Sequence, residues 1–346
     1  MNAEQQYIDL FSQTEAMICR HSTEVMNTPR AIAFADFERL GFPTRKQEKY
    51  KYTDVSKFFE PDYGLNLNRL DIPVNPYEVF KCDVPNMSTS LYFVVNDAFY
   101  NKSLPAAHLP EGVIFGSLKE MAEKHPELVK KYYGKLADTS KDGVTAFNTA
   151  FAQDGVLLYV PKNVIVERPI QLVNILRGDV NFLVNRRVLI VLEDGAQARM
   201  LVCDHAMDAV NFLATQVIEV FVGENAVFDL YELAVHDGGA IGVDGEQEVI
   251  VLGIIVVAHS DGIHRVFVAV GGILLVEPLD TGKAGKHVCD LLIGRIVGRE
   301  QLNVHLCGAG KVLNVLHPDT GLCAGLDPGC KVDLCGRKDQ HQCKQH

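Results

Sequence analysis

The spacing of hydrophobic residues changes along the chain and divides it into a helical part and a β-rich part. Near the N-terminus, apolar residues recur with a period close to 3.6, which predicts an amphipathic helix over Glu4–Arg20. A second helix is expected to begin at Thr28-Pro29, a cap followed by a proline in the first helical position, and to end at Gly41. Residues 1–140 are therefore expected to be mainly helical, with irregular connections.

From about residue 155 the pattern changes to short runs of β-forming residues separated by turns. Two strand–turn–strand units superpose at an offset of 30 residues, with Leu192–Ala196 aligned on Val222–Ala226. Such repeats are typical of a solenoid, in which each coil buries its inner face against the next. An antiparallel sandwich built from hairpins is the alternative. The expected strands are 156–160, 170–176, 188–193, 198–203, 215–222 and 227–232, with inward-facing Leu158, Val160, Ile190, Leu192, Val220 and Val222.

The composition of the chain changes after Glu232. Of the 28 aromatic residues, 27 lie in the first 231 positions, and Phe267 is the other one. Residues 235–346 hold 18 of the 28 glycines, six of the nine cysteines and eight of the twelve histidines, and their hydroxyl residues are Ser260, Thr281 and Thr320. We find no regular coil spacing there. Two interpretations of residues 234–346 are open: translation out of frame or from a rearranged gene, or a divergent end of the solenoid.

Charge and apolar content limit the classes of partner. The net charge of −11 argues against nucleic acid or an anionic membrane surface as the main partner. The longest apolar runs, Val249–Ala258 and Val266–Val276, are shorter than the roughly 20 residues of a membrane-spanning helix. The N-terminus has no secretory signal pattern, and the three thiols before residue 235 (Cys19, Cys82 and Cys203) suit a reducing compartment. We therefore expect a cytoplasmic location.

Several segments resemble one family in its own order along the chain. Gly41–Asp54 reads GFPTRKQEKYKYTD and is similar to the SufD N-terminal signature. Phe147–Pro161 reads FNTAFAQDGVLLYVP, and it is followed by Glu167–Leu172 (ERPIQL) and Arg187–Ala196 (RVLIVLEDGA). These segments are similar to the core shared by SufB and SufD. The chain therefore resembles the SufB/SufD family of iron–sulfur cluster assembly scaffolds over residues 1 to about 233.

The resemblance implies a fold and a set of partners. It implies an N-terminal helical domain (1–140) followed by a right-handed parallel β-helix, whose entry and first rungs are residues 141–233. It also implies a non-catalytic scaffold that acts with a SufB-like subunit and with the ATPase SufC. The nascent iron–sulfur cluster would then bind transiently to the complex, and this chain alone would hold no cofactor stably.

Residues 234–346 do not match the family's C-terminal part. The later rungs, the histidine-bearing segment at the SufB interface and the terminal helices that receive SufC have no counterpart there. We therefore expect a β-helix that is incomplete at its C-terminus and a scaffold whose assembly is impaired. No functional residue is carried over from the family.

The cysteine-rich end and two glycine-rich stretches of the tail invite a ligand interpretation. A structural zinc site favours cysteine pairs two to four residues apart. Of the three gaps between the four cysteines at the end of the tail, one fits this spacing, and near-random sequence explains the four thiols better. Gly282–His287 and Gly308–Val312 echo phosphate loops but lack the hydroxyl and the first glycine, so nucleotide binding is rejected. The four cysteines are Cys323, Cys330, Cys335 and Cys343.

One tripeptide in the β-rich part combines a thiol, a carboxylate and an imidazole. Cys203 and His205 share a face of their strand, while Asp204 points to the other. The pair would suit contact with a cluster or metal, but a buried thiol with a surface imidazole at a turn is the favoured interpretation. A basic group near residue 48 is interpreted as a solvated face. It consists of Arg45, Lys46, Lys49 and Lys51.

Two other functions are weighed against the scaffold. An enzyme on a β-helix, acting on sugars or transferring acyl groups, needs carboxylates or a histidine centre on successive coils. A stand-alone metal-binding module rests on the tail alone. We therefore expect no catalytic residue and no metal site, and we assign no cofactor-binding residue. The acidic residues of the β-rich part form no recurring set at one coil position: Asp194, Asp204, Glu219, Glu224 and Asp229.

Overall fold

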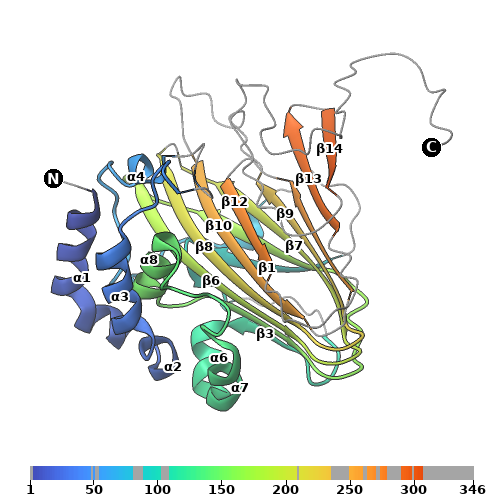
Figure 1. The fold of residues 1–346 in the computed structure, drawn as a ribbon. Helices are drawn as coiled ribbons and strands as arrows, with labels where there is room; N and C mark the ends of the chain where they lie inside the picture. Colours follow the sequence, from blue (N-terminus) through green and yellow to red (C-terminus); the bar gives the residue numbers. More distant parts are fainter. Residues whose placement is uncertain are drawn as a thin grey trace.

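The computed structural model describes residues 3–47, 50, 54–80, 89–102, 109–208 and 210–234, and five strands between residues 249 and 306. The helices are α1 (Ala3–Arg20), α2 (Glu24–Asn27), α3 (Arg30–Leu40), α4 (Val55–Phe58), α5 (Pro76–Val79), α6 (Leu118–Lys124), α7 (Pro126–Tyr132) and α8 (Gly143–Phe151). Helices α1, α2, α3, α6, α7 and α8 lie together on one side of the two main sheets (Figure 1).

The first two predicted helices are confirmed, with one shift of a boundary. Helix α1 buries one apolar face, as its period predicts. Helix α3 begins at Arg30, so Pro29 is the residue before the helix rather than its first residue. Gly41 ends α3 as expected: its φ is 63°, and its N–H donates to the Phe37 carbonyl at 2.8 Å.

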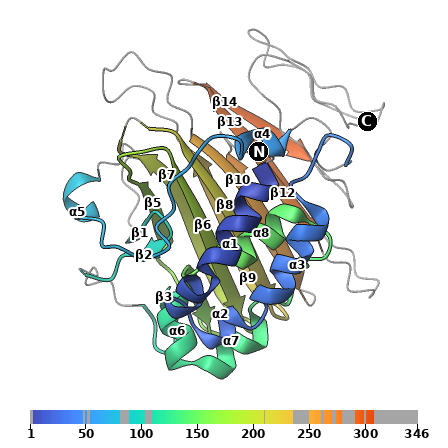
Figure 2. The same ribbon diagram turned by 90° about the vertical axis from the view of Figure 1, so that its left-hand side faces the viewer.

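A cluster of aromatic side chains packs the helices against the sheet that contains Leu213. The Tyr7 ring of α1 meets the Phe147 ring of α8 edge-on, with centroids 5.2 Å apart. Phe42 and Phe59 stack nearby at 3.7 Å, and the cluster continues into Leu213 of the sheet. Figure 2 shows α1, α3 and α8 in front of that sheet. Burial of these rings is the main attraction between the helices and the sheet.

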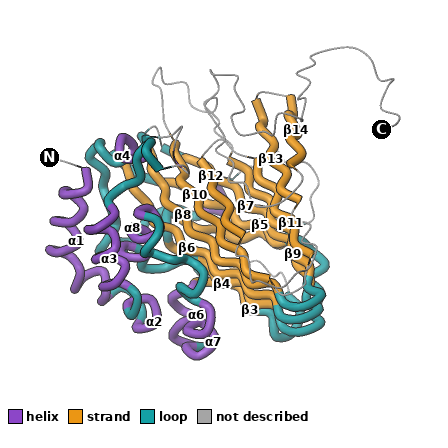
Figure 3. Tube along the Cα trace, viewed as in Figure 1, coloured by secondary structure: helices purple, strands orange, loops and turns teal. Residues whose placement is uncertain are grey.

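Two mixed sheets, mostly parallel, form the rest of the fold (Figure 3). Sheet A has the order β12-β10-β8-β6-β4-β3, and sheet B has the order β14-β13-β11-β9-β7-β5-β1-β2. From β4 to β13, successive strands alternate between the two sheets. The strands are β1 (Ser90–Val95), β2 (Ala98–Phe99), β3 (Ile114–Ser117), β4 (Val156–Val160), β5 (Ile170–Leu176), β6 (Phe182–Leu192), β7 (Gln197–Ala206), β8 (Phe212–Val222), β9 (Val227–Ala234), β10 (Val249–His259), β11 (Ile263–Ala269), β12 (Ile273–Pro278), β13 (Asp290–Val297) and β14 (Glu300–Leu306).

The register predicted from the repeat is confirmed. Leu192 pairs with Val222, and β4, β6 and β8 pair in parallel, as do β5, β7 and β9. The antiparallel hairpin alternative is therefore wrong for these strands. The six residues expected to face inward are all buried in one cluster between the sheets. They form two ladders, Leu158–Ile190–Val220 and Val160–Leu192–Val222.

The turns after β4, β6 and β8 stack on one another at one end of the sheets (Figure 3). Asn163, Gly195 and Asn225 have φ values of 60°, 68° and 55° in these turns. A Cβ on Gly195 would lie 2.3 Å from the Asn163 side-chain oxygen, so glycine is required there. The N–H of Gly195 donates to the Glu224 carbonyl at 2.8 Å, which links consecutive turns.

Strands also occur in two parts of the chain where the sequence did not predict them. Residues 90–117, within the part expected to be mainly helical, contribute β1, β2 and β3, and β1 pairs in parallel with β5. Beyond residue 234, β10 pairs in parallel with β8, and β11 pairs in parallel with β9. Phe212 of β8 is level with Val249, a longer step than the 30 residues of the preceding repeat. The sheets therefore extend beyond the point where the repeat was lost.

Candidate functional site

Cys203, Asp204 and His205 lie near the end of β7, and the strand divides them as predicted. Cys203 and His205 lie on the outer face of sheet B, and Asp204 lies between the sheets. Cys203 is buried, and the Gln171 side-chain amide approaches its sulfur at 3.9 Å. The His205 ring packs edge-on against Phe80, at 5.0 Å between centroids. The expectation of a buried thiol is confirmed, whereas the imidazole lies within the strand, half-buried, and not at a turn.

The described surroundings of this outer face are mostly apolar. Phe93, Val173 and Ile175 are buried there, with Tyr77 and Phe80 from the α5 segment packed over them. Within the described ranges, no group of three or more His, Cys, Asp or Glu side chains is placed to hold a metal ion. A thiol and an imidazole alone are fewer ligands than a structural zinc site uses.

Asp204 forms a buried ion pair across the space between the sheets. Its carboxylate accepts a hydrogen bond from the guanidinium of Arg186 on β6, and the two side chains are 2% and 3% exposed. The Nε of Arg186 also donates to the Asn96 carbonyl at 3.2 Å. The pair therefore joins sheet A to sheet B through their inner faces.

A second buried ion pair lies on the outer face of sheet A. Arg187 donates to Glu219 at 2.8 Å, and both side chains are fully buried. The Glu219 carboxylate also accepts the backbone N–H groups of Gly134, Leu136 and Ala137, at 2.9, 2.9 and 3.2 Å. Burial acts to lower the pKa of Arg187, but the Glu219 charge, the neighbouring Tyr133 and the hydrogen bond to Glu219 together outweigh it, so the pKa is raised. This pair fixes the connection between α7 and α8 to the sheet.

A small pocket of about 210 Å³ lies where the 66–72 loop meets the 95–102 segment. Arg69 reaches Asp97 at 2.6 Å and Asp154 at 3.8 Å. Burial raises the pKa of Asp154, and the Arg69 charge opposes the rise. The Asp154 carboxylate also accepts the Ser117 hydroxyl at 2.8 Å and the Lys119 N–H at 3.0 Å, next to the start of α6. These groups are engaged with one another, which indicates a structural role.

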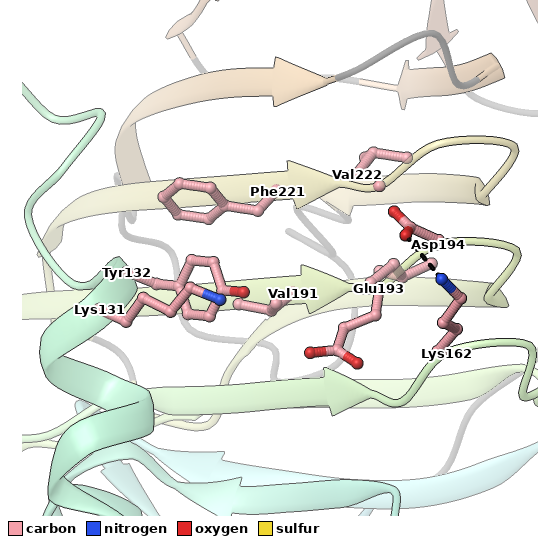
Figure 4. Close-up of a pocket in the computed structure, with 10 residues that line it drawn as sticks. Lys131, Tyr132, Lys162, Val191, Glu193, Asp194, Phe221 and Val222 are labelled. Carbon is pink, nitrogen blue, oxygen red and sulfur yellow. Dashed lines mark hydrogen bonds and ion pairs between the residues drawn. The ribbon is translucent and has the colours of Figure 1, made fainter.

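A larger groove of about 440 Å³ lies on the outer face of sheet A, between the end of α7 and the ends of β6 and β8 (Figure 4). The Tyr132 and Phe221 rings meet edge-on at 4.8 Å, with the Lys131 ammonium 4.7 Å from the Tyr132 ring. Lys162 pairs with Asp194 at 3.1 Å, which lowers the pKa of that carboxyl. Among the described residues that line it, none is a serine, threonine, cysteine or histidine.

The other candidates from the sequence are distributed as follows. Arg45 and Lys46 are exposed, as expected for a solvated face, whereas Lys49, Lys51 and the whole cysteine-rich end lie outside the described residues. Gly282–His287 and Gly308–Val312 also lie outside them. Among the helices that the structure describes, none has the length and apolar character to cross a bilayer.

The five acidic residues do not converge on one site, but two of them recur. Asp194 and Glu224 occupy equivalent turns, and the N–H of Glu224 donates to the Asp194 carboxylate at 3.0 Å. Asp204 lies between the sheets, and Glu219 lies on the outer face of sheet A under the helices. Asp194 and Glu224 therefore recur at one turn position, which the sequence analysis did not expect.

The sequence analysis missed the buried arginines. Arg30 is 1% exposed and donates to the carbonyls of Ala150 and Ala152, at the end of α8. Arg186 and Arg187 stand side by side within a β-run, and that charge inside an apolar pattern was the available signal. Their partners are distant in the sequence, so spacing alone did not reveal them.

Comparison with known proteins identifies the N-terminal half of the chain. Residues 1–172 match the SufBD protein N-terminal region. The chain is 29% identical over 214 residues to the iron–sulfur cluster assembly SufBD family protein ABCI9 of Arabidopsis thaliana, covering 57% of this chain and 46% of the relative. It is 33% identical over 150 residues to the iron–sulfur cluster assembly protein SufD of Bacillus subtilis, covering 42% and 33%. To the SufBD family protein slr0074 of Synechocystis it is 35% identical over 120 residues, covering 34% and 24%.

These matches agree with one another and with the segments GFPTRKQEKYKYTD and FNTAFAQDGVLLYVP. Through this part of its sequence the chain belongs to the SufB/SufD family, whose curated members are named for iron–sulfur cluster assembly. The chain spans less than half of the length of each of these relatives.

Proposed function

We propose that this chain is a non-catalytic scaffold subunit of cytoplasmic iron–sulfur cluster assembly. The family match over residues 1–172 carries the proposal. Two buried ion pairs support it, because Arg187–Glu219 holds the α7–α8 connection to sheet A and Arg186–Asp204 joins the two sheets.

The partners that we propose are a SufB-like subunit and a SufC-like ATPase. We also propose that the alternating strands β4 to β9 are coils of a right-handed parallel β-helix. The nascent cluster would be a transient guest of the complex. The support is the parallel register and the family resemblance of the segments within it.

Assembly is proposed to be impaired in this chain. The composition of residues 234–346 departs from that of the preceding part, and no segment of them resembles the helices that receive SufC. Strands β10 and β11 continue the sheets, which favours a divergent end of the solenoid for these two strands. Translation of the same DNA in the other frames past codon 233 would distinguish the two origins: recovery of SufD-like rungs would favour a shifted frame.

Co-purification tests the partners. The tagged chain is co-expressed with SufB-like and SufC-like subunits, beside a matched chimera in which residues 234–346 are replaced by the C-terminal part of the Bacillus subtilis SufD. We expect the chimera to recover both partners, and the natural chain to recover little SufB-like and no SufC-like subunit. A stable ternary complex of the natural chain would contradict the impairment. Failure of both proteins to bind either partner would contradict the scaffold role.

Turnover assays test the absence of catalysis. The purified chain should hydrolyse neither ATP nor glycoside and ester substrates. Reproducible turnover that disappears on changing a residue within 155–232 would favour an enzyme on the same fold.

A further inference from the structure

A layer of polar side chains lies inside the space between the sheets. Toward the stacked turns it is bounded by an apolar cluster that includes Leu172, Val188 and Val202, and on the other side by a second one that includes Leu176 and Val184. The strand alternation places sheet B residues on one side of the layer and sheet A residues on the other. These polar residues are Asn96, Asn174 and Asp204 of the sheet B side, and Arg186 and Gln216 of sheet A, all at most 3% exposed.

Several polar atoms of this layer form hydrogen bonds within the protein. Arg186 donates through Nη1 to Asp204 Oδ1 and through Nε to the Asn96 carbonyl. The Asn96 side chain donates to the Arg177 carbonyl at 2.9 Å and accepts the Arg177 N–H at 2.8 Å. These bonds fix the positions of Arg186 and Asp204 and leave each of them one polar atom to spare.

Among the described residues of the layer, three buried polar atoms have no hydrogen-bond partner. They are Nη2 of Arg186, Oδ2 of Asp204 and Nδ2 of Asn174. The first two belong to one ion pair, so they lie near each other. Asn174 is the register neighbour of Asp204 on the adjacent strand, which brings its amide to the same place. Since buried donors and acceptors almost always form hydrogen bonds, a bound molecule or ion that hydrogen-bonds to all three atoms is expected here.

The chemistry of the three atoms limits the kind of molecule or ion that can bind here. One guanidinium and one carboxylate balance in charge, so neither an anion nor a cation is favoured. Two donors and one acceptor require a bound molecule that both accepts and donates hydrogen bonds. It must also be small, because apolar clusters close the layer on both sides. On sheet A the register neighbour of Gln216 is Gly253, which adds no side chain to the layer.

We propose that a buried water molecule occupies this place and bridges Arg186, Asp204 and Asn174. It accepts from the Arg186 Nη2 and the Asn174 Nδ2, and it donates to the Asp204 Oδ2. A buried water with three hydrogen bonds is an ordinary component of a protein interior. The site is part of the core that joins the sheets and is separate from the groove beside α7.

Water relaxation dispersion on the full chain counts long-lived internal waters and tests the proposal in solution. The natural chain is compared with the triple variant Arg186→Met, Asn174→Leu, Asp204→Leu, and with Arg199→Met, which removes a guanidinium from the outer face of β7. We expect the triple variant to lose one long-lived water and Arg199→Met to lose none. An unchanged count in a folded triple variant would overturn the proposal.

A crystal structure of the natural chain tests it without any variant, and so it decides the matter even if the triple variant does not fold. We expect electron density for one water within hydrogen-bonding distance of the three atoms. A dry layer in which Asn174 donates directly to Asp204, or density for an ion or a larger molecule at this position, would overturn the proposal.

Discussion

Arg186 and Arg187 are neighbours on β6, yet they serve two different layers of the molecule. Arg187 points to the outer face of sheet A, where Glu219, the Thr149 hydroxyl and the Tyr133 ring surround it. Arg186 points inward and crosses to Asp204 of sheet B. The outer pair is embedded in further hydrogen bonds, because Glu219 also accepts three backbone N–H groups. The inner pair has fewer protein partners.

The difference shows how charge is used in this fold. On the outer face, a carboxylate replaces water for the backbone of the α7–α8 connection, so Glu219 has a role that no apolar residue can fill. Between the sheets, the pair joins two faces that apolar side chains also join elsewhere. Removal of the outer pair is therefore expected to cost more stability than concerted replacement of the inner one.

The largest effect is expected for Glu219→Leu. This change leaves the Arg187 charge buried without a carboxylate and three backbone N–H groups without an acceptor. The free energy of unfolding, measured by urea titration, should fall by about 3–5 kcal/mol. Glu224→Gln, at an exposed turn, should stay within about 0.5 kcal/mol of the natural chain. A loss below about 1 kcal/mol for Glu219→Leu would show that the outer pair is dispensable.

A pH-dependent effect is expected for Tyr50, in the helical part. Its hydroxyl donates to Asp142, the residue before α8, at 2.6 Å, and burial together with that carboxylate raises its pKa well above 10. Folding therefore holds this proton, so its contribution is full below pH 10 and is lost as the pH rises through the folded-state pKa. Tyr50→Phe should lose about 1.5–3 kcal/mol at pH 8.

The comparison between the two proteins at higher pH checks the sign. Above pH 10 the natural chain should lose unfolding free energy more steeply than Tyr50→Phe, in which the other buried tyrosines are retained. Parallel curves between pH 8 and 11 would mean that this hydroxyl does not hold its proton in the folded state.

A steric effect of comparable size is expected for Gly155→Ala. The added Cβ would lie 2.0 Å from the Arg187 carbonyl oxygen, so β4 and β6 must separate or the backbone must shift. The thermal midpoint should fall, with a cost of about 1–3 kcal/mol. Gly116→Ala is the matched control, because the atom nearest to its added Cβ, the Met121 methyl carbon, is 3.5 Å away. Equal midpoints for the two variants would place the close contact between β4 and β6 in doubt.

The smallest net effect is expected for the double variant Arg186→Met, Asp204→Leu. Each single change leaves one buried charge unpaired, whereas the double change replaces both charges with apolar side chains. The double variant should therefore stay within about 1 kcal/mol of the natural chain, and each single variant should be less stable than it. A double variant as unstable as Glu219→Leu would erase the distinction between the two layers.

The part of the fold that repeats locally was predictable from the sequence. The ladders through Ile190 and Leu192 follow from a period of two and a 30-residue repeat, both visible in the sequence. The sequence predicted that this strand would begin at Val188, because Asn185, Arg186 and Arg187 interrupt the apolar pattern before it. Strand β6 in fact begins at Phe182. Each of these polar residues has a buried partner, and the spacing along the strand carries no sign of that.

Pairings between distant segments were not predictable. Strand β1 is a short apolar run among loops, and only its pairing with β5 makes it part of sheet B. Arg30 contacts α8, and Arg69 contacts Asp97 and Asp154, across separations that no local pattern encodes. The candidate site was predicted in part: the sequence placed Cys203 and His205 on one face, but the partner of Asp204 is known from the structure alone.

Anaerobic reconstitution with iron and sulfide tests the scaffold account most directly. The chain alone, and the chimera in complex with SufB-like and SufC-like subunits, are desalted, and the iron and sulfide retained per chain are measured. The account predicts that a cluster is retained with the complex and that the chain alone retains none. Retention of a stoichiometric cluster by the chain alone, lost on Cys203→Ala, would contradict the account and make β7 a cluster site.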